Sequence, residues 1–575
     1  MTNAEAARAF EEIADLMEIK GEEPFRVNSY RRVARTLEDL AVELTDVAAR
    51  GELASLPGVG KASAEKLDEL LRTGRIALRD ELTREVPATV LELLRVPGLG
   101  PKKAALLWRE RGVTSLAELK SCIESGRLAD LRGFGKKSID QIRQGISFIE
   151  SSAGRARLGW AWSVAERVAD ELRRIPGVAR VEQAGSLRRG CETVGDLDLL
   201  CIADDGAAVV DAFTKITGVE AVLAHGPTKG SIRLTPEAGK SIQVDLRVVP
   251  ADSFGAAWQY FTGSKQHNVR LRERAVKRGW TLNEYGLTEG ERVLASRSEQ
   301  EIYAALGLPW IPPELREDRG ELDLTEVPPD LLSLDMIRGD LHMHTTASDG
   351  RASIAEMAQA ALQRGYQYIA ITDHSQSSAV AGGLKPDRLL QHIADVRRVA
   401  RDFPKLTLLA GAEVDILSDR LDYPDELLAQ LDWVVASIHF GMGHDIEANT
   451  RRALLAIQSP YVNVLAHPTG RLINKREAMP LDIDAVSRAA ARTGTALEIN
   501  ASAYRLDLRD VHARLARDNG ATICIDTDAH AVEQLDQMRF GVLTARRAWL
   551  RRDDVLNTRP IEAIRAFVTA RRPRA

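Results

Sequence analysis

Several residue patterns are scarce or absent in this sequence of 575 residues, and each absence excludes a class of protein. No run reaches the roughly 18 consecutive apolar residues of a transmembrane helix, and the N-terminus is acidic and amphipathic, unlike a signal peptide. Only four cysteines occur, widely scattered and without a Cys-x-x-Cys pair, which argues against a disulfide framework and a thiolate zinc site. We therefore expect a cytoplasmic protein with no membrane segment, in which the cysteines are small core residues.

Basic residues are not in excess either. The 78 Lys and Arg residues against 83 Asp and Glu residues give a formal net charge of −5. This lowers the expectation of nucleic-acid binding only slightly, because backbone amides can bind phosphate without a basic surface and an acidic domain can mask a basic one. With 44% hydrophobic and 28% charged residues, the composition is that of a globular protein. The chain is too long for a single core, so we expect several domains.

The N-terminal part is predicted to be helical, and three similar short sequences lie between its helices. They are Leu56-Pro-Gly-Val-Gly60, Val96-Pro-Gly-Leu-Gly100 and Leu131-Arg-Gly-Phe-Gly135, and each is followed by lysine. Glycine lets the backbone turn tightly, and the next helix then offers its N-terminal amides to a phosphate. One such loop would be an ordinary helix connection, whereas three resemble the helix-hairpin-helix element, which binds the DNA backbone without reading sequence. The predicted DNA-contacting glycines are Gly58, Gly60, Gly98, Gly100, Gly133 and Gly135.

Two acidic strand segments near the middle of the chain predict a metal-dependent site. Asp196 and Asp198 stand two residues apart in an apolar run, so both side chains lie on one face of a strand. Asp245, in a second strand-like run over 242–249, supplies a third carboxylate. Mg²⁺ prefers oxygen ligands and takes few protein carboxylates, which leaves positions for substrate phosphates and water. Taken alone, an Asp-x-Asp pair is more often a solvated strand end than a catalytic site.

A glycine-serine turn precedes this pair of aspartates. Gly185 and Ser186 lie between a short apolar strand and a basic segment, where backbone amides and a hydroxyl group would be exposed to a phosphate, with Arg189 close by. Hydrogen-bond donors for phosphate and carboxylate ligands for a metal would then lie together around one triphosphate. The combination favours a nucleotidyl-transfer site for a triphosphate over an ordinary strand end.

Two further segments follow the acidic strands. Tyr260 and Phe261 form an aromatic pair that ends at Gly263. Such a pair usually belongs to the hydrophobic core, but it is also suited to packing against a sugar and its base while excluding a 2′-hydroxyl group.

The segment 311–329 is proline-rich and strongly acidic, with little periodicity, and we expect a linker there.

The C-terminal region alternates short β-like runs with helices, which predicts a parallel barrel. The expected strands cover 368–372, 407–412, 433–439, 462–466, 496–499 and 522–525. Histidine, aspartate and glutamate recur at the ends of the strands, and the C-terminal strand ends of such a barrel face one pocket. One histidine at a strand end is more often a satisfied core residue, but the repeated pattern predicts a polynuclear metal site. Clustered divalent ions favour hydrolysis of a phosphodiester.

The central motif resembles the active site of family X DNA polymerases, and the barrel resembles the polymerase and histidinol phosphatase (PHP) domain. Together these motifs cover nearly the whole chain. The resemblance implies that Asp196 and Asp198 hold both Mg²⁺ (or Mn²⁺) ions of the polymerase and that Asp245 holds the catalytic one. The implied nucleotide-binding residues are Gly185, Ser186, Arg189, Tyr260, Phe261, Gly263, Asn268 and Arg272.

The PHP resemblance implies nine ligands that hold three divalent metals. It assigns one metal to His342, His344, Glu413 and Asp528, a second to Glu413, His439 and His467, and a third to Asp349, His374 and His530. Because the ligands are nitrogen and oxygen only, Mn²⁺, Zn²⁺ and Fe²⁺ all remain candidates.

The resemblance also extends to the lyase domain of family X polymerases. Lys66 matches the lysine that forms a Schiff base with a 5′-deoxyribose phosphate, and Arg26, Asn28 and Tyr30 match the 5′-phosphate site. A lysine can do this only where burial or a nearby positive charge lowers its pKa. An exposed helical lysine without this activity is the alternative at Lys66.

We therefore predict a multidomain protein with a helical N-terminal region, an α+β nucleotidyltransferase palm and thumb, and a C-terminal distorted (β/α) barrel of PHP type. The expected parts are a lyase-like helix-hairpin-helix domain (1–80), a fingers-type helix-hairpin-helix domain (81–155), the palm (156–250), the thumb (251–315), a linker (316–338) and the PHP domain (339–575).

The predicted function is DNA-directed DNA synthesis that fills short gaps in repair, with 3′–5′ exonuclease or 3′-end processing by the barrel. The partners would be gapped or primed DNA and dNTPs, and we expect a monomer that does not bind membranes. Three alternatives remain open: a PHP nuclease whose inactive polymerase region holds DNA ends, a non-catalytic scaffold, and a small-molecule phosphatase in the barrel.

Overall fold

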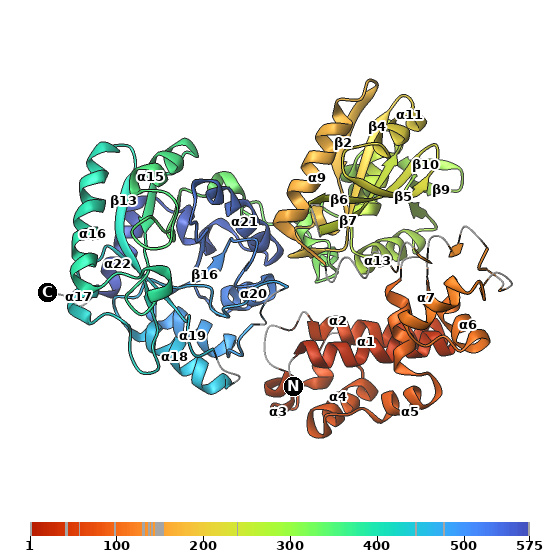
Figure 1. Ribbon diagram of the computed structural model, residues 1–575, viewed down its shortest axis with the longest axis horizontal. Coiled ribbons are helices and arrows are strands. Elements are labelled where there is room, and N and C mark those ends of the chain that lie inside the picture. Colours follow the sequence, from red (N-terminus) through yellow and green to blue (C-terminus); the bar gives the residue numbers. More distant parts are fainter. Residues whose placement is uncertain are drawn as a thin grey trace. The chain divides into compact units, whose positions relative to one another are not determined.

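The computed structural model describes most of the chain (Figure 1). The described residues are 3–38, 40, 44–56, 58–96, 99–128, 131, 133–135, 138–139, 142–143, 146, 155–237, 240–442, 445–474, 476 and 478–572. The chain forms two compact units, one of residues 1–154 with 233–241 and one of residues 155–232 with 242–575. Within the described ranges, no helix combines the length and the apolar character needed to cross a membrane.

The N-terminal region is helical, as predicted. Its elements are α1 (Asn3–Lys20), α2 (Pro24–Glu38), α3 (Leu44–Ala49), η1 (Leu53–Ser55), α4 (Lys61–Thr73), α5 (Ala77–Glu85), η2 (Ala88–Arg95), α6 (Pro101–Arg111) and α7 (Leu116–Glu124). The helices α4 and α6 begin directly after Gly60 and Gly100, which cap them with extended backbone. Gly58 and Gly133 have φ angles of 74° and 89°, a conformation that favours glycine. The predicted helix-hairpin-helix character is confirmed.

The palm contains a five-stranded sheet in the order β2-β4-β7-β6-β5. The sheet strands are β2 (Val178–Gln183), β4 (Asp196–Ala203), β5 (Val219–His225), β6 (Lys229–Glu237) and β7 (Lys240–Val248), and the helices are α9 (Leu158–Arg173), α10 (Gly185–Arg188) and α11 (Gly206–Phe213). A short two-stranded sheet joins β1 (Ala156–Arg157) to β3 (Thr193–Val194). The two strands with the predicted catalytic aspartates, β4 and β7, are neighbours and run parallel.

The thumb follows the palm sheet. Its elements are η3 (Ala251–Ser253), α12 (Phe254–Thr262), α13 (Lys265–Val276), β8 (Thr281–Asn283), β9 (Gly286–Glu289), β10 (Arg292–Ala295) and α14 (Glu299–Ala305), and the three strands form an antiparallel sheet. Leu271, Leu282 and Tyr303 belong to its core. The same core includes Leu331 and Trp549, so the thumb packs together with the segment that follows it and with the C-terminal region.

The segment predicted as a linker begins with buried residues. It contains η4 (Pro313–Leu315), η5 (Glu321–Asp323) and η6 (Leu334–Met336). The Arg316 side chain is fully buried, and its guanidinium donates to both carboxylate oxygens of Glu299, at 2.5 and 2.9 Å. Glu314 binds Arg546 at 2.9 Å. Acidic residues that indicate solvent exposure in the sequence are here neutralised by arginines that are distant along the chain.

The C-terminal region is a nearly closed parallel barrel of seven strands, which confirms the predicted architecture. The strands follow chain order: β11 (Gly339–Asp340), β12 (Tyr368–Ile371), β13 (Thr407–Asp415), β14 (Trp433–Ser437), β15 (Val464–Leu465), β16 (Ala496–Asn500) and β17 (Ile523–Asp526). The first and last strand ends meet where the His344 N–H donates to the Ala529 carbonyl at 2.8 Å. Closure gathers the C-terminal ends of all strands around one mouth.

Helices alternate with the barrel strands (Figure 1). The α-helices are α15 (Ile354–Gln363), α16 (Pro386–Val399), α17 (Asp425–Leu428), α18 (Ile446–Gln458), α19 (Ile483–Thr493), α20 (Asp510–Asp518), α21 (Met538–Arg547) and α22 (Ile561–Arg571), with short turns η7 (Ala379–Ala381), η8 (Ala400–Asp402), η9 (Val532–Gln537), η10 (Arg552–Asp554) and η11 (Leu556–Thr558). Buried aliphatic strand residues such as Ile369, Val434 and Ile499 form the core with these helices. This packed interior holds the loops at the mouth in place.

Candidate active sites

The first candidate site lies on β4 and β7 of the palm. In the parallel pairing of these strands, Asp198 stands directly beside Asp245, and Asp196 stands beside Gln243. Residues paired in register point to the same face of the sheet, so the three aspartates share one face. The Gln243 amide donates to the Asp245 carboxylate at 3.1 Å, which orients that carboxylate.

The charges of these aspartates repel one another. Burial, followed by the neighbouring charges of Asp196 and Asp245, raises the pKa of Asp198 to about 7. Burial and Asp245 likewise raise the pKa of Asp196. An oxygen-only set of carboxylates that repel each other fits divalent cations of the Mg²⁺ type, since a bound cation would stabilise the ionised form.

The turn that precedes β4 is fixed against the same aspartates. Gly185 has a φ of 64°, and a Cβ atom there would lie 2.2 Å from Oδ2 of Asp198. The Ala184 N–H donates to the Asp198 carbonyl at 2.9 Å. Only glycine therefore fits at the start of α10, the short helix that carries Ser186.

The two arginines of this turn have buried acidic partners that sequence reasoning missed. Arg188 donates to both oxygens of Glu299, at 2.7 and 2.9 Å, and its guanidinium lies 3.4 Å from the centre of the Trp258 ring. Arg189 binds Glu317 at 2.9 Å and donates to the Thr262 carbonyl at 2.8 Å. The predicted triphosphate ligand Arg189 thus belongs to an ion-pair network.

The predicted sugar-discriminating turn lies between α12 and α13. The rings of Tyr260 and Phe261 meet edge to face with centroids 5.1 Å apart. Asn268 donates to the carbonyls of Tyr260 at 2.6 Å and Gly263 at 3.2 Å, so it holds the turn together. Arg272 is exposed, and its Nε donates to the Asn268 carbonyl at 3.3 Å. The structure therefore brings the predicted residues of this turn together.

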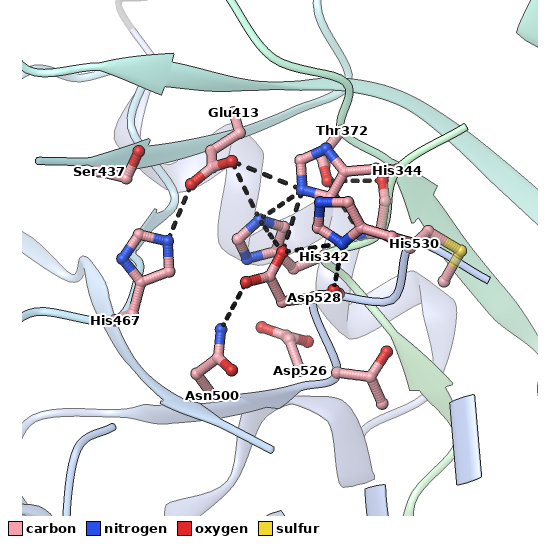
Figure 2. Close-up of polar contacts among 12 residues, drawn as sticks. His342, His344, Thr372, Glu413, Ser437, His467, Asn500, Asp526, Asp528 and His530 are labelled. Atoms are coloured by element: carbon pink, nitrogen blue, oxygen red, sulfur yellow. Dashed lines mark hydrogen bonds and ion pairs between the residues drawn. The ribbon is translucent and has the colours of Figure 1, made fainter. Parts of the chain in front are cut away.

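The second candidate site is the mouth of the barrel (Figure 2). Eight of the nine predicted ligands follow strands, and Glu413 lies near the end of β13. Figure 2 labels six of them: His342, His344, Glu413, His467, Asp528 and His530. Glu413 is at the centre: its Oε1 lies 3.0 Å from Nε2 of His467 and 3.3 Å from Nε2 of His439. Its Oε2 lies 3.5 Å from Nε2 of both His342 and His344.

The remaining ligands complete this cluster. Asp528 Oδ1 lies 3.1 Å from Nε2 of His344, and Asp349 lies 3.4 Å from His530 and 3.6 Å from His374. Among the described residues, three groups have ligand atoms close enough to share a metal: His342, His344 and Glu413; His374, Glu413 and His439; and His344, Asp349, His374 and His530. Glu413 belongs to two groups, as a bridging ligand would. His374 also falls in two groups, whereas the resemblance assigned it to one metal.

The chemistry of this donor set fits divalent metals. Nδ1 of His374 lies 2.9 Å from Oε2 of Glu413, and both residues are buried. Burial opposes ionisation of Glu413, but the imidazoles of His439, His374 and His342 outweigh it and hold the pKa of Glu413 well below its usual value. Imidazole nitrogens gathered around an ionised carboxylate form a nitrogen and oxygen donor set that suits divalent metals.

Several residues that hydrogen-bond to the predicted metal ligands were not predicted from the sequence. Nδ1 of His342 lies 2.7 Å from Glu498, and Nδ1 of His439 lies 2.7 Å from Asp415. Asn500 donates to Oδ2 of Asp528 at 3.1 Å (Figure 2). Such contacts orient imidazole and carboxylate ligands. Their sequence signal is weak: Asp415 and Asn500 end β13 and β16, and Glu498 lies within β16.

The predicted lyase residues lie in α2 and α4. Nζ of Lys66 lies 3.2 Å from the Ala62 carbonyl, Arg26 pairs with Glu22, and Asn28 is exposed. The Tyr30 ring is 9% exposed and packs on Phe10, with centroids 6.0 Å apart. Gly98, predicted to contact DNA, lies outside the described residues. The lyase and DNA-binding assignments stay predictions.

Fold and sites together define a class of two-centre protein, with a carboxylate triad in a nucleotidyltransferase-type palm and a metal-binding barrel of PHP type. Family models match residues 1–76 (helix-hairpin-helix domain), 90–147 (SAM-like helix-hairpin-helix tandem), 257–317 (DNA polymerase beta thumb) and 340–502 (PHP domain). The chain is 40% identical over 571 residues to the DNA polymerase/3′-5′ exonuclease PolX of Bacillus subtilis (strain 168), and the match covers 99% of both chains. It belongs to the PolX family.

Other relatives match part of the chain. A probable phosphatase of Thermoanaerobacter sp. (strain X514) is 30% identical over 231 residues, which is 38% of this chain and 89% of that protein. A probable phosphatase of Shewanella sediminis is 29% identical over 243 residues, or 40% of this chain and 94% of that protein. The chain is therefore similar both to a full-length polymerase and to proteins less than half its length.

Proposed function

We propose that the chain is a DNA-directed DNA polymerase that fills short gaps in DNA repair and that its barrel removes nucleotides from 3′ ends. The observation that carries the proposal is the presence of two separate acidic centres in one chain: Asp198 beside Asp245 in the palm, and nine potential ligands at the barrel mouth. The Bacillus subtilis relative is named as both a DNA polymerase and a 3′-5′ exonuclease, which supports one activity for each centre.

In the polymerase reaction, the three aspartates would hold two Mg²⁺ or Mn²⁺ ions. Bound in this way, the metals would lower the pKa of the primer 3′-hydroxyl and neutralise the charge that develops on the phosphates. Gln243 keeps the Asp245 carboxylate oriented, and Gly185 lets the predicted triphosphate turn approach Asp198. Positioning and charge, rather than covalent chemistry, are what the protein supplies in phosphoryl transfer.

In the barrel, nitrogen and oxygen ligands would hold up to three divalent ions, with Mn²⁺, Zn²⁺ and Fe²⁺ as candidates. These ions would supply the Lewis acidity that phosphodiester hydrolysis needs. The contacts of His342 with Glu498 and of His439 with Asp415 hold these two rings with Nε2 toward Glu413. The helix-hairpin-helix glycines would bind the DNA backbone and favour DNA as the substrate of both centres.

A one-nucleotide gapped duplex with dNTPs and with Mg²⁺ or Mn²⁺ in turn tests the proposal. Asp196→Ala with Asp198→Ala is expected to abolish extension and spare 3′ degradation, and His342→Ala with His344→Ala is expected to do the reverse. If either pair of substitutions removed both activities while the fold stayed intact, the assignment of one activity to each centre would be wrong.

A second candidate activity for the barrel is the removal of a phosphate from a 3′ end. The relatives named as probable phosphatases match 38–41% of this chain but 89–94% of their own length, so they lack a counterpart to most of it. An oligonucleotide with a 3′-phosphate distinguishes the activities: a phosphatase releases inorganic phosphate and leaves the chain length unchanged, whereas an exonuclease shortens the chain.

A further inference from the structure

The barrel mouth is a cavity of about 330 Å³ whose wall is not formed by metal ligands alone. Six of the predicted ligands line it, and so do Arg505, Phe440, Ser378 and Ala381. Ser378 donates to Asp415 at 2.8 Å, so its hydroxyl is used within the protein. Arg505 and Phe440 have no role in holding the metals, and their chemistry is that of substrate recognition.

Arg505 lies in the wall of this cavity, beside the predicted metal ligand Asp528. Its side chain is 17% exposed, and its Nε lies 3.6 Å from Oδ2 of Asp528. Nη1 is buried and donates to no acceptor among the described residues. Because Oδ2 of Asp528 belongs to a predicted metal ligand and Arg505 also lines the cavity, the guanidinium lies next to the metal-binding cluster. A buried guanidinium N–H without an acceptor is costly, and a phosphate oxygen would satisfy it.

The backbone around Arg505 is held in place. The Arg505 N–H donates to the Ser502 carbonyl at 2.8 Å, and its own carbonyl accepts from Nε of Arg471 at 2.8 Å. The planar fork of a guanidinium binds phosphate through two parallel hydrogen bonds when its position is fixed in advance. Arg505 is therefore positioned to bind an anion beside the metals.

Phe440 places an aromatic ring at the same mouth. It follows the ligand His439, and the two rings meet edge to face with centroids 6.4 Å apart. The Phe440 side chain is 49% exposed although the residue is apolar. Nη1 of Arg452 donates to the Phe440 carbonyl at 2.9 Å, which anchors this part of the loop. An exposed ring next to a phosphate site is suited to stacking on a nucleobase.

We propose that Arg505 and Phe440 form the nucleotide subsite of the metal centre, and that its substrate is the unpaired 3′-terminal nucleotide of a DNA strand. Arg505 binds the phosphate that links this nucleotide to the strand, and Phe440 stacks on the terminal base. A base within a duplex has both faces covered, so it reaches Phe440 only when it is frayed, mismatched or flipped out. The cavity volume is that of a pocket for one small ligand, not for a duplex. This inference rests on the proposed exonuclease function.

The test uses the full chain without dNTPs, in Mn²⁺, on a single-stranded oligonucleotide labelled at its 5′ end. Two substrates are compared, one with a normal 3′-terminal nucleotide and one whose terminal sugar lacks the base. Phe440→Ala is expected to lower kcat/KM roughly tenfold on the normal end, the size expected for loss of one base stack, and to leave the abasic end unchanged. Phe440→Tyr keeps an aromatic ring and should stay within about twofold of wild type.

Substitution of Arg505 is expected to change kcat/KM in a different way from substitution of Phe440. Arg505→Ala should lower kcat/KM about 100-fold on both substrates, because the phosphate is common to them, and Arg505→Lys should recover part of the loss. The metal content of both variants, measured on the purified protein, should equal that of wild type. Tyr285→Ala, an exposed aromatic residue between β8 and β9 of the thumb, is the matched control and should change nothing.

Three results would overturn the inference. An equal loss for Phe440→Ala on normal and abasic ends would exclude base stacking. Loss of metal from Arg505→Ala would make Arg505 a structural partner of Asp528.

Failure of the exonuclease proposal itself is recognised separately, since the wild-type protein would then degrade neither substrate. In that case the fluorescence of a 2-aminopurine base at the 3′ end, measured as the DNA binds, tests the subsite. Loss of the fluorescence quenching in Phe440→Ala supports base stacking on Phe440, and unchanged quenching excludes it.

Discussion

Nε of Arg189 donates to the Glu317 carboxylate at 2.9 Å, and the same oxygen accepts from Nη1 of Arg547 at 2.8 Å. This carboxylate joins the predicted triphosphate turn of the palm to α21 of the barrel. Its side chain is 8% exposed. Burial opposes its ionisation, but the two arginines outweigh burial and hold the pKa of Glu317 well below its usual value.

Removing this charge should destabilise the protein. Glu317→Gln leaves two buried guanidinium groups with a neutral partner, and breaking such a pair typically costs about 3–5 kcal/mol. We expect a lower midpoint of denaturant unfolding, measured by circular dichroism on the full chain. Asp419→Asn is the control, because Asp419 and its partner Arg420 are both about 70% exposed and such pairs contribute less than about 1 kcal/mol. Equal midpoints for the two variants would contradict the network's role in stability.

Replacing Gly185 should separate the two activities by steric means. In Gly185→Ala the new Cβ would lie 2.2 Å from the Asp198 carboxylate, at a φ of 64°. We expect gap filling to fall at least about 100-fold, since a displacement of about 1 Å at a reacting group has this effect, while 3′ degradation is retained. Gly279→Ala is the matched control: its φ is 77° but nothing lies within 4 Å of the added Cβ. That variant should lose about 1 kcal/mol of stability and keep polymerase activity.

Metal binding by the palm should depend on pH near neutrality. The raised pKa of Asp198, about 7, means that the carboxylate is protonated below this pH and must release a proton to bind a metal. The affinity for Mg²⁺ should therefore fall about tenfold per pH unit below 7 and level off above 8. Calorimetry in buffers of different ionisation enthalpy measures the proton that is released on metal binding. The measurement uses a variant with His342→Ala and His344→Ala, which lacks two of the barrel ligands. A flat affinity between pH 6 and 8 would contradict the prediction.

Asp415 should matter for metal retention although it is no ligand. Its Oδ1 lies 2.7 Å from Nδ1 of His439 and orients that ring. Asp415→Asn is expected to weaken metal binding about 10–100-fold, the usual effect of losing such a contact. Metal content after dialysis against a weak chelator measures it, with exposed Asp419→Asn as the control. Full retention of metal by the Asp415 variant would show that His439 is oriented without it.

The lyase prediction depends on a primary amine at one position. If Lys66 forms a Schiff base with a 5′-deoxyribose phosphate, borohydride should trap wild-type protein on such DNA. Lys66→Ala should abolish the trapped product, and so should Lys66→Arg, which keeps the positive charge and the DNA contact. Trapping that persists in both variants would assign the chemistry to another amine.

Much of the fold could be predicted from local sequence patterns. The helix-hairpin-helix loops follow from glycines between helical runs, and six of the seven barrel strands were expected from short β-like runs. The pairing of Asp196 with Asp198 on one face follows from the two-residue period of a strand. These features depend on backbone preferences of neighbouring residues, which the sequence displays directly.

Other features could not be predicted because they depend on contacts between distant residues. The segment after residue 311 has the composition of a linker, yet its Arg316 is buried against Glu299 and its Glu317 between Arg189 and Arg547. A run of charges has the same sequence pattern whether water or a partner neutralises it. Burial in the fold decides between the two.

The sequence by itself therefore determined the class of each domain, the strands that carry the aspartates and the residue types at the barrel mouth, because each depends on local periodicity or composition. Only the tertiary structure decided that Asp198 stands in register with Asp245, that Glu498 and Asp415 orient the histidines, and that Arg505 and Phe440 share the cavity. These relationships depend on strand pairing and barrel closure, which join segments tens to hundreds of residues apart.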